Sequence, residues 1–171
     1  MQLLEKEVED FIYNDLAFND GDELDGRGLQ LQSYRNYSAP KWFRQLSIEP
    51  YGITDIVGFY RRDGYLHADL LELKAVPIAL EHFEQISRYK RGLEIYLKNT
   101  FKNFGTIQCY LIGNGYDGLY IQNGINIHVA SYEYNLHGIM FDHHAPYSGW
   151  QITNAKDRSF RKRKINAKEI Y

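Results

Sequence analysis

The sequence predicts a single domain of the mixed α/β (α+β) class, in which a central mixed sheet is flanked by helices. Three observations lead to this prediction. Apolar residues recur at helical spacing near the start of the chain and again near its middle. Two runs rich in β-branched, aromatic and leucine residues precede the second helix, and the short turn between them is typical of a β-hairpin. Glycine-bearing turns then alternate with strand-like runs, so additional C-terminal strands are expected.

The first helix is expected from about Leu3 to Phe18, where one face is apolar and the other is crowded with acids. Residues 19–28 contain three glycines and four acids and are expected to form a loop. From residue 29 to residue 47 the pattern is weak and Pro40 acts as a breaker, which favours short or irregular elements.

The hairpin is expected to comprise residues 52–60 and 65–75, joined by Arg61-Arg62-Asp63-Gly64. Pro77 opens the second helix, which extends to about Thr100 because Pro is favoured at a first helical position and one face stays apolar. The strands expected after this helix are residues 106–112, 119–122, 126–134 and 138–142.

Charge is unevenly distributed along the 171 residues, although the net charge is only −2. Residues 1–25 hold nine acids and one base, whereas residues 156–168 hold seven bases and one acid. The basic tail predicts phosphate contacts, and the alternative is a solvated terminal arm. The tail residues chosen as nucleic-acid-binding candidates are Arg161, Lys162, Arg163 and Lys164.

Several classes of protein are excluded by composition. Cys109 is the single cysteine, so an internal disulfide cannot form, and no Cys/His spacing fits a structural zinc site. No apolar run approaches the roughly 18 to 20 residues of a membrane-spanning helix, and the N-terminus turns acidic too early for a secretory signal. We therefore expect a cytoplasmic protein without a membrane partner, and a homodimer is left open.

Two carboxylates meet on one face of the predicted hairpin. If Asp63-Gly64 forms a two-residue turn, opposed residues have numbers that sum to 127, which places Asp55 opposite Glu72. Lys74 follows Glu72 by two residues, so the pleat places it on the same face. The sequence thus predicts a cluster of two acids and one base.

The surroundings of this cluster indicate its chemistry. The neighbouring positions of both strands are apolar, which is typical of interior strands covered on both sides. Like charges paired inside a sheet need compensation, and a divalent cation together with Lys74 would supply it. Oxygen ligands select Mg²⁺ or Mn²⁺, and such a site suits phosphodiester hydrolysis. The alternative is a surface ion pair on an edge strand.

These residues resemble a known superfamily. Asp55 followed by Glu72-Leu73-Lys74 after a hairpin is similar to the D…(D/E)-x-K core of PD-(D/E)xK, or restriction-endonuclease-like, nucleases. The preceding helix carries Glu5 and Glu9, and the following helix holds Gln85 and Tyr89, similar to the Q-x-x-x-Y element of RecB-like and Cas4-like members. Thr54 stands where the family often has proline. The resemblance covers about residues 3–112.

The resemblance implies a metal-dependent nuclease with a restriction-endonuclease-like core that acts on DNA. Asp55 and Glu72 would bind the metal, Glu9 would complete the ligand set, and Lys74 would assist the attacking water. Gln85 and Tyr89 would contact nucleic acid or metal-bound water. On this interpretation the chain is one domain with a core at about residues 3–112, a β-rich extension at 113–155 and a basic tail at 156–171.

Two other functions stay open at this point. The first is a non-catalytic nucleic-acid-binding or assembly module that retains the nuclease fold. The second is a small enzyme of unrelated chemistry that uses the C-terminal half. The G-x-G-x-x-G at residues 113–118 lacks the following helix of a dinucleotide site, and Asp142-His143-His144 is interpreted as a loop or rim.

Overall fold

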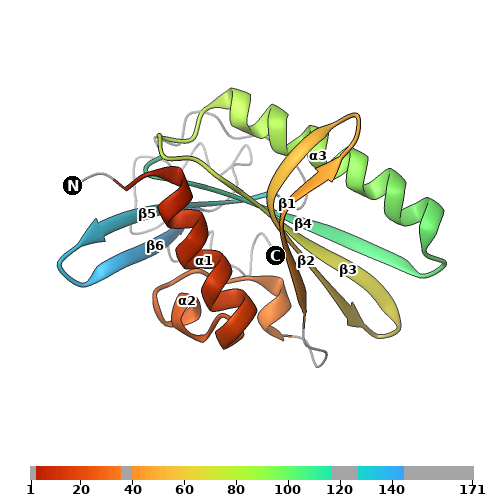
Figure 1. Cartoon of the computed structure of the whole chain (residues 1–171), viewed down its shortest axis with the longest axis horizontal. Helices are drawn as coiled ribbons and strands as arrows, with labels where there is room; N and C mark the ends of the chain where they lie inside the picture. The colour runs from red at the N-terminus through yellow and green to blue at the C-terminus, as the bar shows by residue number, and fades with distance from the viewer. Residues whose placement is uncertain (1–2, 36–39, 117–126, 145–171) are drawn as a thin grey trace, which may run out of the picture.

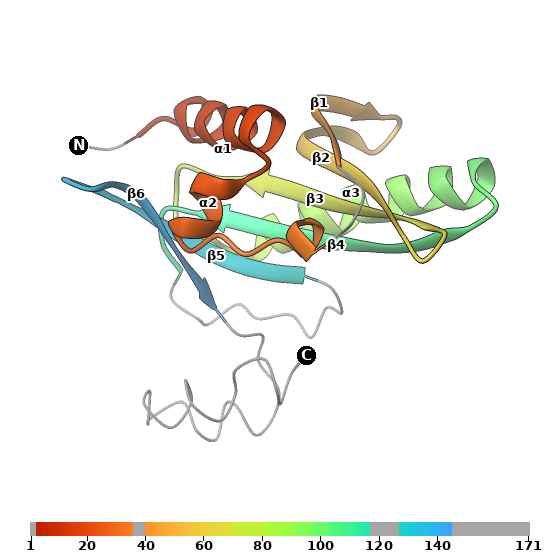
Figure 2. The same ribbon diagram turned by 90° about the horizontal axis from the view of Figure 1, so that it is seen from below.

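The computed structural model is a six-stranded mixed sheet with helices on both faces (Figures 1 and 2). It describes residues 3–35, 40–116 and 127–144. The strands lie in the sheet in chain order, from β1 to β6. Neighbouring strands are antiparallel, except that β4 runs parallel to both β3 and β5. The predicted mixed α/β class is therefore confirmed.

The chain forms its helices and strands in the order α1 (Glu5–Asn19), α2 (Asp22–Gly26), a 3₁₀ turn (Gln32–Arg35), β1 (Lys41–Ile48), β2 (Gly52–Arg62), β3 (Tyr65–Leu73), α3 (Leu80–Thr100), β4 (Phe104–Gly113), β5 (Ile127–Asn135) and β6 (Gly138–His144).

Each face of the sheet has its own hydrophobic core. Side chains alternate between faces along a strand, so Leu70 packs into the cluster beneath α3 while Leu71 packs into the cluster beneath α1. β3 is buried from Leu66 to Leu73 because both of its faces and both of its edges are covered. The expectation of an interior strand is confirmed for β3.

The prediction of a loop at residues 19–28 is wrong, because the chain forms the short helix α2 there. Asp20 and Gly21 adopt left-handed φ angles of 53° and 76°, which turn the chain sharply after α1. The Asp15 carboxylate then accepts a hydrogen bond from the Leu24 amide at 2.9 Å, and the Leu24 side chain is fully buried. A buried leucine among acids is enough to fold the segment back onto α1.

β1 is the second departure from expectation, because a regular strand occupies residues that the sequence indicated to be irregular. Its exposure alternates along the strand, and it pairs with β2 in the register Lys41↔Phe59 to Ile48↔Gly52. Pro40 directly precedes the strand instead of breaking it. β1 does not stand out by pattern alone, because Arg44 occupies one of its half-buried positions and Phe43 one of its exposed positions, which breaks the alternation of apolar and polar residues.

α3 begins three residues later than expected. Pro77 forms an isolated parallel bridge with Gly115, and the helix starts at Leu80. His82 Nδ1 accepts a hydrogen bond from the Ala79 amide at 2.9 Å, which satisfies one of the unpaired donors of a helix N-terminus. The helix then reaches Thr100 as predicted.

β5 and β6 confirm the expected additional strands and are joined to the N-terminal region. Arg27 Nη1 donates to the carbonyl oxygens of His137 and Ile139 at 3.0 and 3.1 Å. The Phe141 amide donates to the Arg27 carbonyl at 2.9 Å. The strand expected at residues 119–122 and the basic tail at 156–171, including Arg161, Lys162, Arg163 and Lys164, lie outside the described residues.

Two findings bear on the classes excluded by composition. None of the helices in the described ranges is both long and apolar enough to cross a membrane. Cys109 is a fully buried free thiol in β4, and burial raises its pKa to about 12. The thiol is therefore protonated at neutral pH and unsuited to nucleophilic chemistry.

Gly28 and Gly26 provide a matched test of the contact between the α2 region and β6. Gly28 has φ of +98°, and a Cβ there would lie 2.5 Å from the Phe141 carbonyl oxygen, whereas a Cβ at Gly26 would meet nothing within 4 Å. We expect Gly28→Ala to lower the free energy of unfolding by about 1 to 2 kcal/mol or more, and Gly26→Ala, within α2, to leave it unchanged or raise it by up to about 1 kcal/mol. Urea denaturation of both variants measures the difference. Equal stabilities would contradict the described packing.

Candidate active site

The site lies where β2 separates from β3. The predicted register is confirmed from Arg62↔Tyr65 to Ile56↔Leu71, each pair summing to 127. The ladder ends there, and β1 with the N-terminal half of β2 curves away from β3 (Figure 1). The Leu73 amide donates instead to Oδ2 of Asp55 at 2.8 Å. The carboxylate of Asp55 is therefore held at the point of divergence.

Glu72 and Lys74 are positioned by the parallel pairing of β3 with β4. Glu72 pairs with Leu111, and the Lys74 amide donates to the Ile112 carbonyl at 2.8 Å. Lys74 Nζ lies 3.6 Å from Oε1 of Glu72, and the lysine side chain is only 15% exposed. Because β3 lies between β2 and β4, the alternative of a surface ion pair on an edge strand is wrong.

The two carboxyl groups are buried together and compete for one negative charge. Asp55 is 9% exposed and Glu72 is 3% exposed. Burial, and next the charge of Asp55, raise the pKa of Glu72 to about 9, although Lys74 opposes the shift. Burial also raises the pKa of Asp55, against the hydrogen bond from Leu73. In the ion-free protein at neutral pH, Glu72 thus holds a proton.

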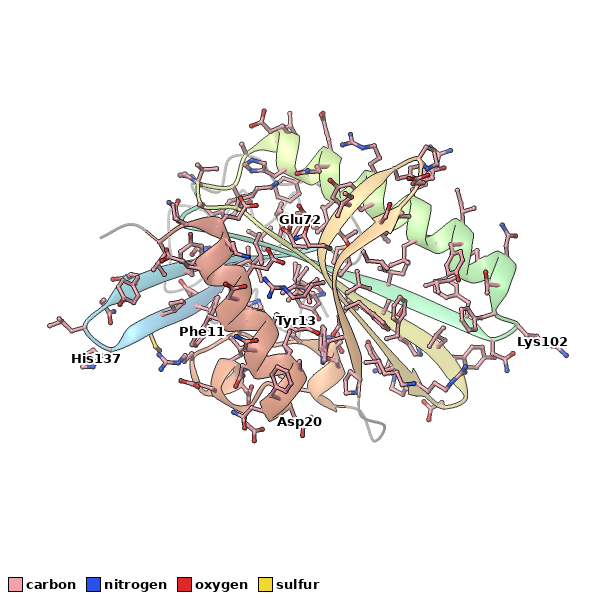
Figure 3. The ribbon with its side chains drawn as sticks, in the orientation of Figure 1. Phe11, Tyr13, Asp20, Glu72, Lys102 and His137 are labelled. Carbon is pink, nitrogen blue, oxygen red and sulfur yellow. The ribbon has the colours of Figure 1, made fainter. Side chains whose placement is uncertain are left out.

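Glu72 also has an unpartnered oxygen. Its Oε2 is buried and accepts no hydrogen bond from the described residues. Glu72 lies between α1 and the β1–β2 pair (Figure 3). Buried polar atoms are nearly always paired, so an unpaired carboxyl oxygen beside a second carboxyl group marks a place that can accept a cation.

Glu9 approaches this pair from α1 but is held by β1. Its Oε1 accepts hydrogen bonds from Arg44 Nε at 3.1 Å and Gln45 Nε2 at 3.0 Å. The charges of Glu9 and then Glu5 contribute to the raised pKa of Asp55, which places both glutamates near it. Across the described ranges, however, no three Asp, Glu, His or Cys side chains converge into a group that could hold a metal ion. The structure does not bring Glu9 into such a set.

Gln85 and Tyr89 share a helix face, as expected from their spacing. Gln85 Nε2 donates to the Tyr89 hydroxyl at 2.9 Å, and Tyr89 is buried within the cluster beneath α3. Gly52, with φ of +130°, allows the Tyr89 ring to approach the start of β2, because a Cβ there would lie 2.6 Å from that ring. Tyr89 therefore links α3 to the strand that carries Asp55.

His82 was not a candidate from the sequence, yet it lies beside the site. It is 8% exposed, and burial followed by the positive charge of Lys74 lowers its pKa. With Nδ1 accepting from Ala79, the neutral ring carries its proton on Nε2. The sequence holds one signal for the location of His82 beside the site. His82 lies in the first turn of the helix expected after Pro77, and this helix follows the strand that carries Glu72.

Two other sequence motifs make contacts of their own. Asn114, in the glycine-rich segment, donates from Nδ2 to the Ala75 carbonyl at 2.7 Å, and residues 117 and 118 of that segment lie outside the described part of the chain. His143 accepts from the Gln30 amide at 2.9 Å, whereas His144 Nε2 lies 2.8 Å from Ser131 Oγ. The two histidines thus contact different partners.

Comparison with known proteins finds no family model, curated protein or solved structure that matches the chain. The site is therefore interpreted from its own geometry.

The raised pKa of Glu72 predicts how the stability of the ion-free protein depends on pH. At Glu72 the folded state binds more protons than the unfolded chain between about pH 4.5 and pH 9, so the contribution of this group to stability falls as pH rises across this range. Glu72→Gln keeps the shape without the ionisation. We expect the variant to gain roughly 1 to 3 kcal/mol relative to wild type between pH 5 and pH 9.

Urea denaturation in EDTA measures this difference. Burial also raises the pKa of the fully buried Asp69, to about 7. The titration of Asp69 contributes equally to the free energy of unfolding of both proteins, so it cancels in the comparison. Curves of unfolding free energy against pH that run parallel for the two proteins would show that Glu72 is not protonated in the fold.

Proposed function

We propose that this chain is a metal-dependent nuclease that hydrolyses phosphodiester bonds, with DNA as its substrate. The observation that carries the proposal is the buried pair Asp55 and Glu72, which has an unpaired oxygen and an adjacent lysine ammonium. Buried polar atoms are nearly always paired, and Glu72 Oε2 is the one carboxyl oxygen among the four buried side-chain oxygens of the described residues that lack a hydrogen-bond partner. With both carboxyl groups ionised, Lys74 alone would leave the site short of positive charge.

The order of elements supports a restriction-endonuclease-like core. α1 is followed by three antiparallel strands, then by α3 and the parallel strand β4. The proposal assigns Asp55 on β2, Glu72 on β3 and Lys74 directly after β3 to the D…(D/E)-x-K motif. DNA is the substrate class that the same resemblance implies.

The residues present fit a magnesium or manganese ion. Asp55 and Glu72 offer only oxygen atoms, which these ions prefer, and they would be the residues that hold it. A bound ion would neutralise phosphate charge and lower the pKa of a water molecule. Glu72 would give up its proton on binding the ion, because the ion replaces that proton as the source of positive charge.

Lys74 would act as a charge directed at the reacting centre. Its ammonium group is a donor and not a metal ligand, and it lies 3.6 Å from Oε1 of Glu72. In this position it can orient an attacking water or stabilise negative charge that develops on the phosphate. Gln85, held by Tyr89, would contribute an amide oxygen toward water or nucleic acid.

One observation favours the alternative of a non-catalytic nucleic-acid-binding module. Oε1 of Glu9, which was expected as a third ligand, already accepts hydrogen bonds from Arg44 and Gln45. A centre with two protein carboxylates would therefore need the substrate phosphate to complete it. Incubation of the purified protein with linear, circular and single-stranded DNA and with RNA, in Mg²⁺, Mn²⁺ or EDTA, separates the two functions.

Asp55→Asn and Glu72→Gln should each abolish metal-dependent cleavage, because each replaces a charged ligand with a neutral amide of the same shape. Both variants should remain folded by circular dichroism, since the Asn side chain can still accept from the Leu73 amide. Asp142→Asn, an exposed acid on β6, is the matched control and should cleave as wild type does. Wild-type turnover in either test variant would show that the pair is not the catalytic centre.

Lys74→Met should have a different effect. We expect Mn²⁺ binding by calorimetry to persist, because the ammonium is not a ligand, while turnover falls by about 100-fold or more. If the variant lost metal affinity together with activity, Lys74 would have to act by organising the ligands and not by assisting the reaction.

A further inference from the structure

We propose that the solvent-facing side of α3 carries a basic stripe, formed by Arg88, Arg91 and Lys98 with Lys102 just beyond the helix, that binds the phosphate backbone of the nucleic acid. The choice of ligand rests on the proposed function. The position of the stripe does not, because it follows from the exposure and spacing of these side chains.

The stripe lies opposite the buried side of α3. Arg88, Arg91 and Lys98 follow one another at intervals of three and seven residues, which places them along one side of a helix. All three are exposed, whereas the residues of the opposite side pack against the sheet. From Arg88 to Lys98 the helix rises about 15 Å, the axial length of roughly four nucleotides of one duplex strand. The basic groups are therefore spaced to meet successive phosphates.

The charge of this segment is strongly biased. Residues 88–102 contain five bases and one acid, Glu94. Among the described residues, Lys98 is the only member of the stripe with an ion-pair partner, Glu94 at 2.7 Å. Arg88 lies over the Tyr89 ring, 5.9 Å from its centroid, and forms no ion pair with another residue in the described ranges. Arg91 and Lys102 are exposed.

Stabilisation of the helix itself does not account for the stripe. Basic residues favour the last turn of a helix, where they offset its dipole. That effect explains Lys98, in the last turn before Thr100, but not Arg88 and Arg91, which lie two to three turns from the end. The effect falls off within a single turn.

The position of the stripe also suits the candidate active site. α3 begins beside Lys74, whose charge lowers the pKa of His82 in the first turn of the helix. Arg88 lies six residues further on, about 9 Å along the helix axis. Lys102 lies at the opposite end of α3 from Glu72 (Figure 3). A strand bound along α3 would lead toward the acidic pair past Glu81 and Glu84, two exposed acids in the first turns of the helix.

The opposite face of the domain would repel the same ligand. α1 covers the other side of the sheet and carries five acids and one base. A polyanion approaching a chain of net charge −2 would therefore be attracted to the α3 side and repelled from the α1 side.

The test compares two triple variants of the full-length chain with the same change in charge. The stripe variant is Arg88→Gln/Arg91→Gln/Lys98→Gln. The control is Lys6→Gln/Lys41→Gln/Arg61→Gln, which removes three exposed bases from α1, β1 and β2. Both are made in a Glu72→Gln background to prevent turnover. Fluorescence anisotropy with a labelled DNA duplex of random sequence is recorded in Mg²⁺ at several KCl concentrations.

We expect the stripe variant to lose at least about tenfold in affinity and up to about 2.7 units of log–log salt slope, at about 0.9 per lost phosphate contact. The control should retain most of the slope. Equal slopes in the two triple variants would overturn the stripe. A second result would also overturn it. If the Glu72→Gln parent bound no duplex and sedimentation velocity showed that the stripe variant differs from it in oligomeric state, the stripe would contact a second copy of the chain and not a nucleic acid.

The two proposals fail separately. Cleavage by wild type together with an unchanged salt slope in the stripe variant would retain the nuclease and reject the stripe. Loss of slope in the stripe variant, in a protein that cleaves nothing, would retain the stripe and reject catalysis.

Discussion

Two carboxyl groups buried side by side at the divergence of β2 from β3 are the constraint on which the rest of the structure depends. Taking an ion out of water costs several kcal/mol, and a second like charge beside it adds to that cost. The fold meets part of the cost locally. The Leu73 amide donates to Asp55, and Lys74 lies 3.6 Å from Glu72. Two features remain without compensation. One oxygen of Glu72 has no hydrogen-bond partner among the described residues, and Glu72 has to hold a proton.

The energies involved indicate that Asp55 and Glu72 would bind a divalent cation. Removing the proton from Glu72 at pH 7, with a pKa of about 9, costs about 3 kcal/mol. A doubly charged ion about 4 Å from one carboxylate gains roughly 8 kcal/mol at an effective dielectric constant of 20, before the cost of its own dehydration. Displacement of the proton by a divalent cation is therefore feasible, whereas leaving two bare carboxylates in place is not. This difference is the physical basis of the proposed nuclease.

The sequence predicted the parts of the fold that depend on local geometry and strong periodicity. The turn at Asp63-Gly64 fixed the hairpin register as far as Ile56↔Leu71, and Asp55 meets Glu72 one position further on, where the ladder has ended. The helix ending at Thr100 followed from its apolar face. β1 and α2 were missed because each depends on one or two tertiary contacts, such as the burial of Leu24 or pairing with β2, that no local pattern contains. The engagement of Glu9 with Arg44 was missed for the same reason, because β1 was not expected at all.

The most direct test of the buried pair is the number of protons that the protein releases when it binds Mn²⁺ at neutral pH. Calorimetric titration in two buffers of different ionisation enthalpy measures this number. If Glu72 is protonated in the ion-free protein and becomes a ligand, wild type will release about one proton per ion bound, and Glu72→Gln will release none. Binding of Mn²⁺ without proton release, or no binding by wild type at all, would contradict a cation site at Asp55 and Glu72.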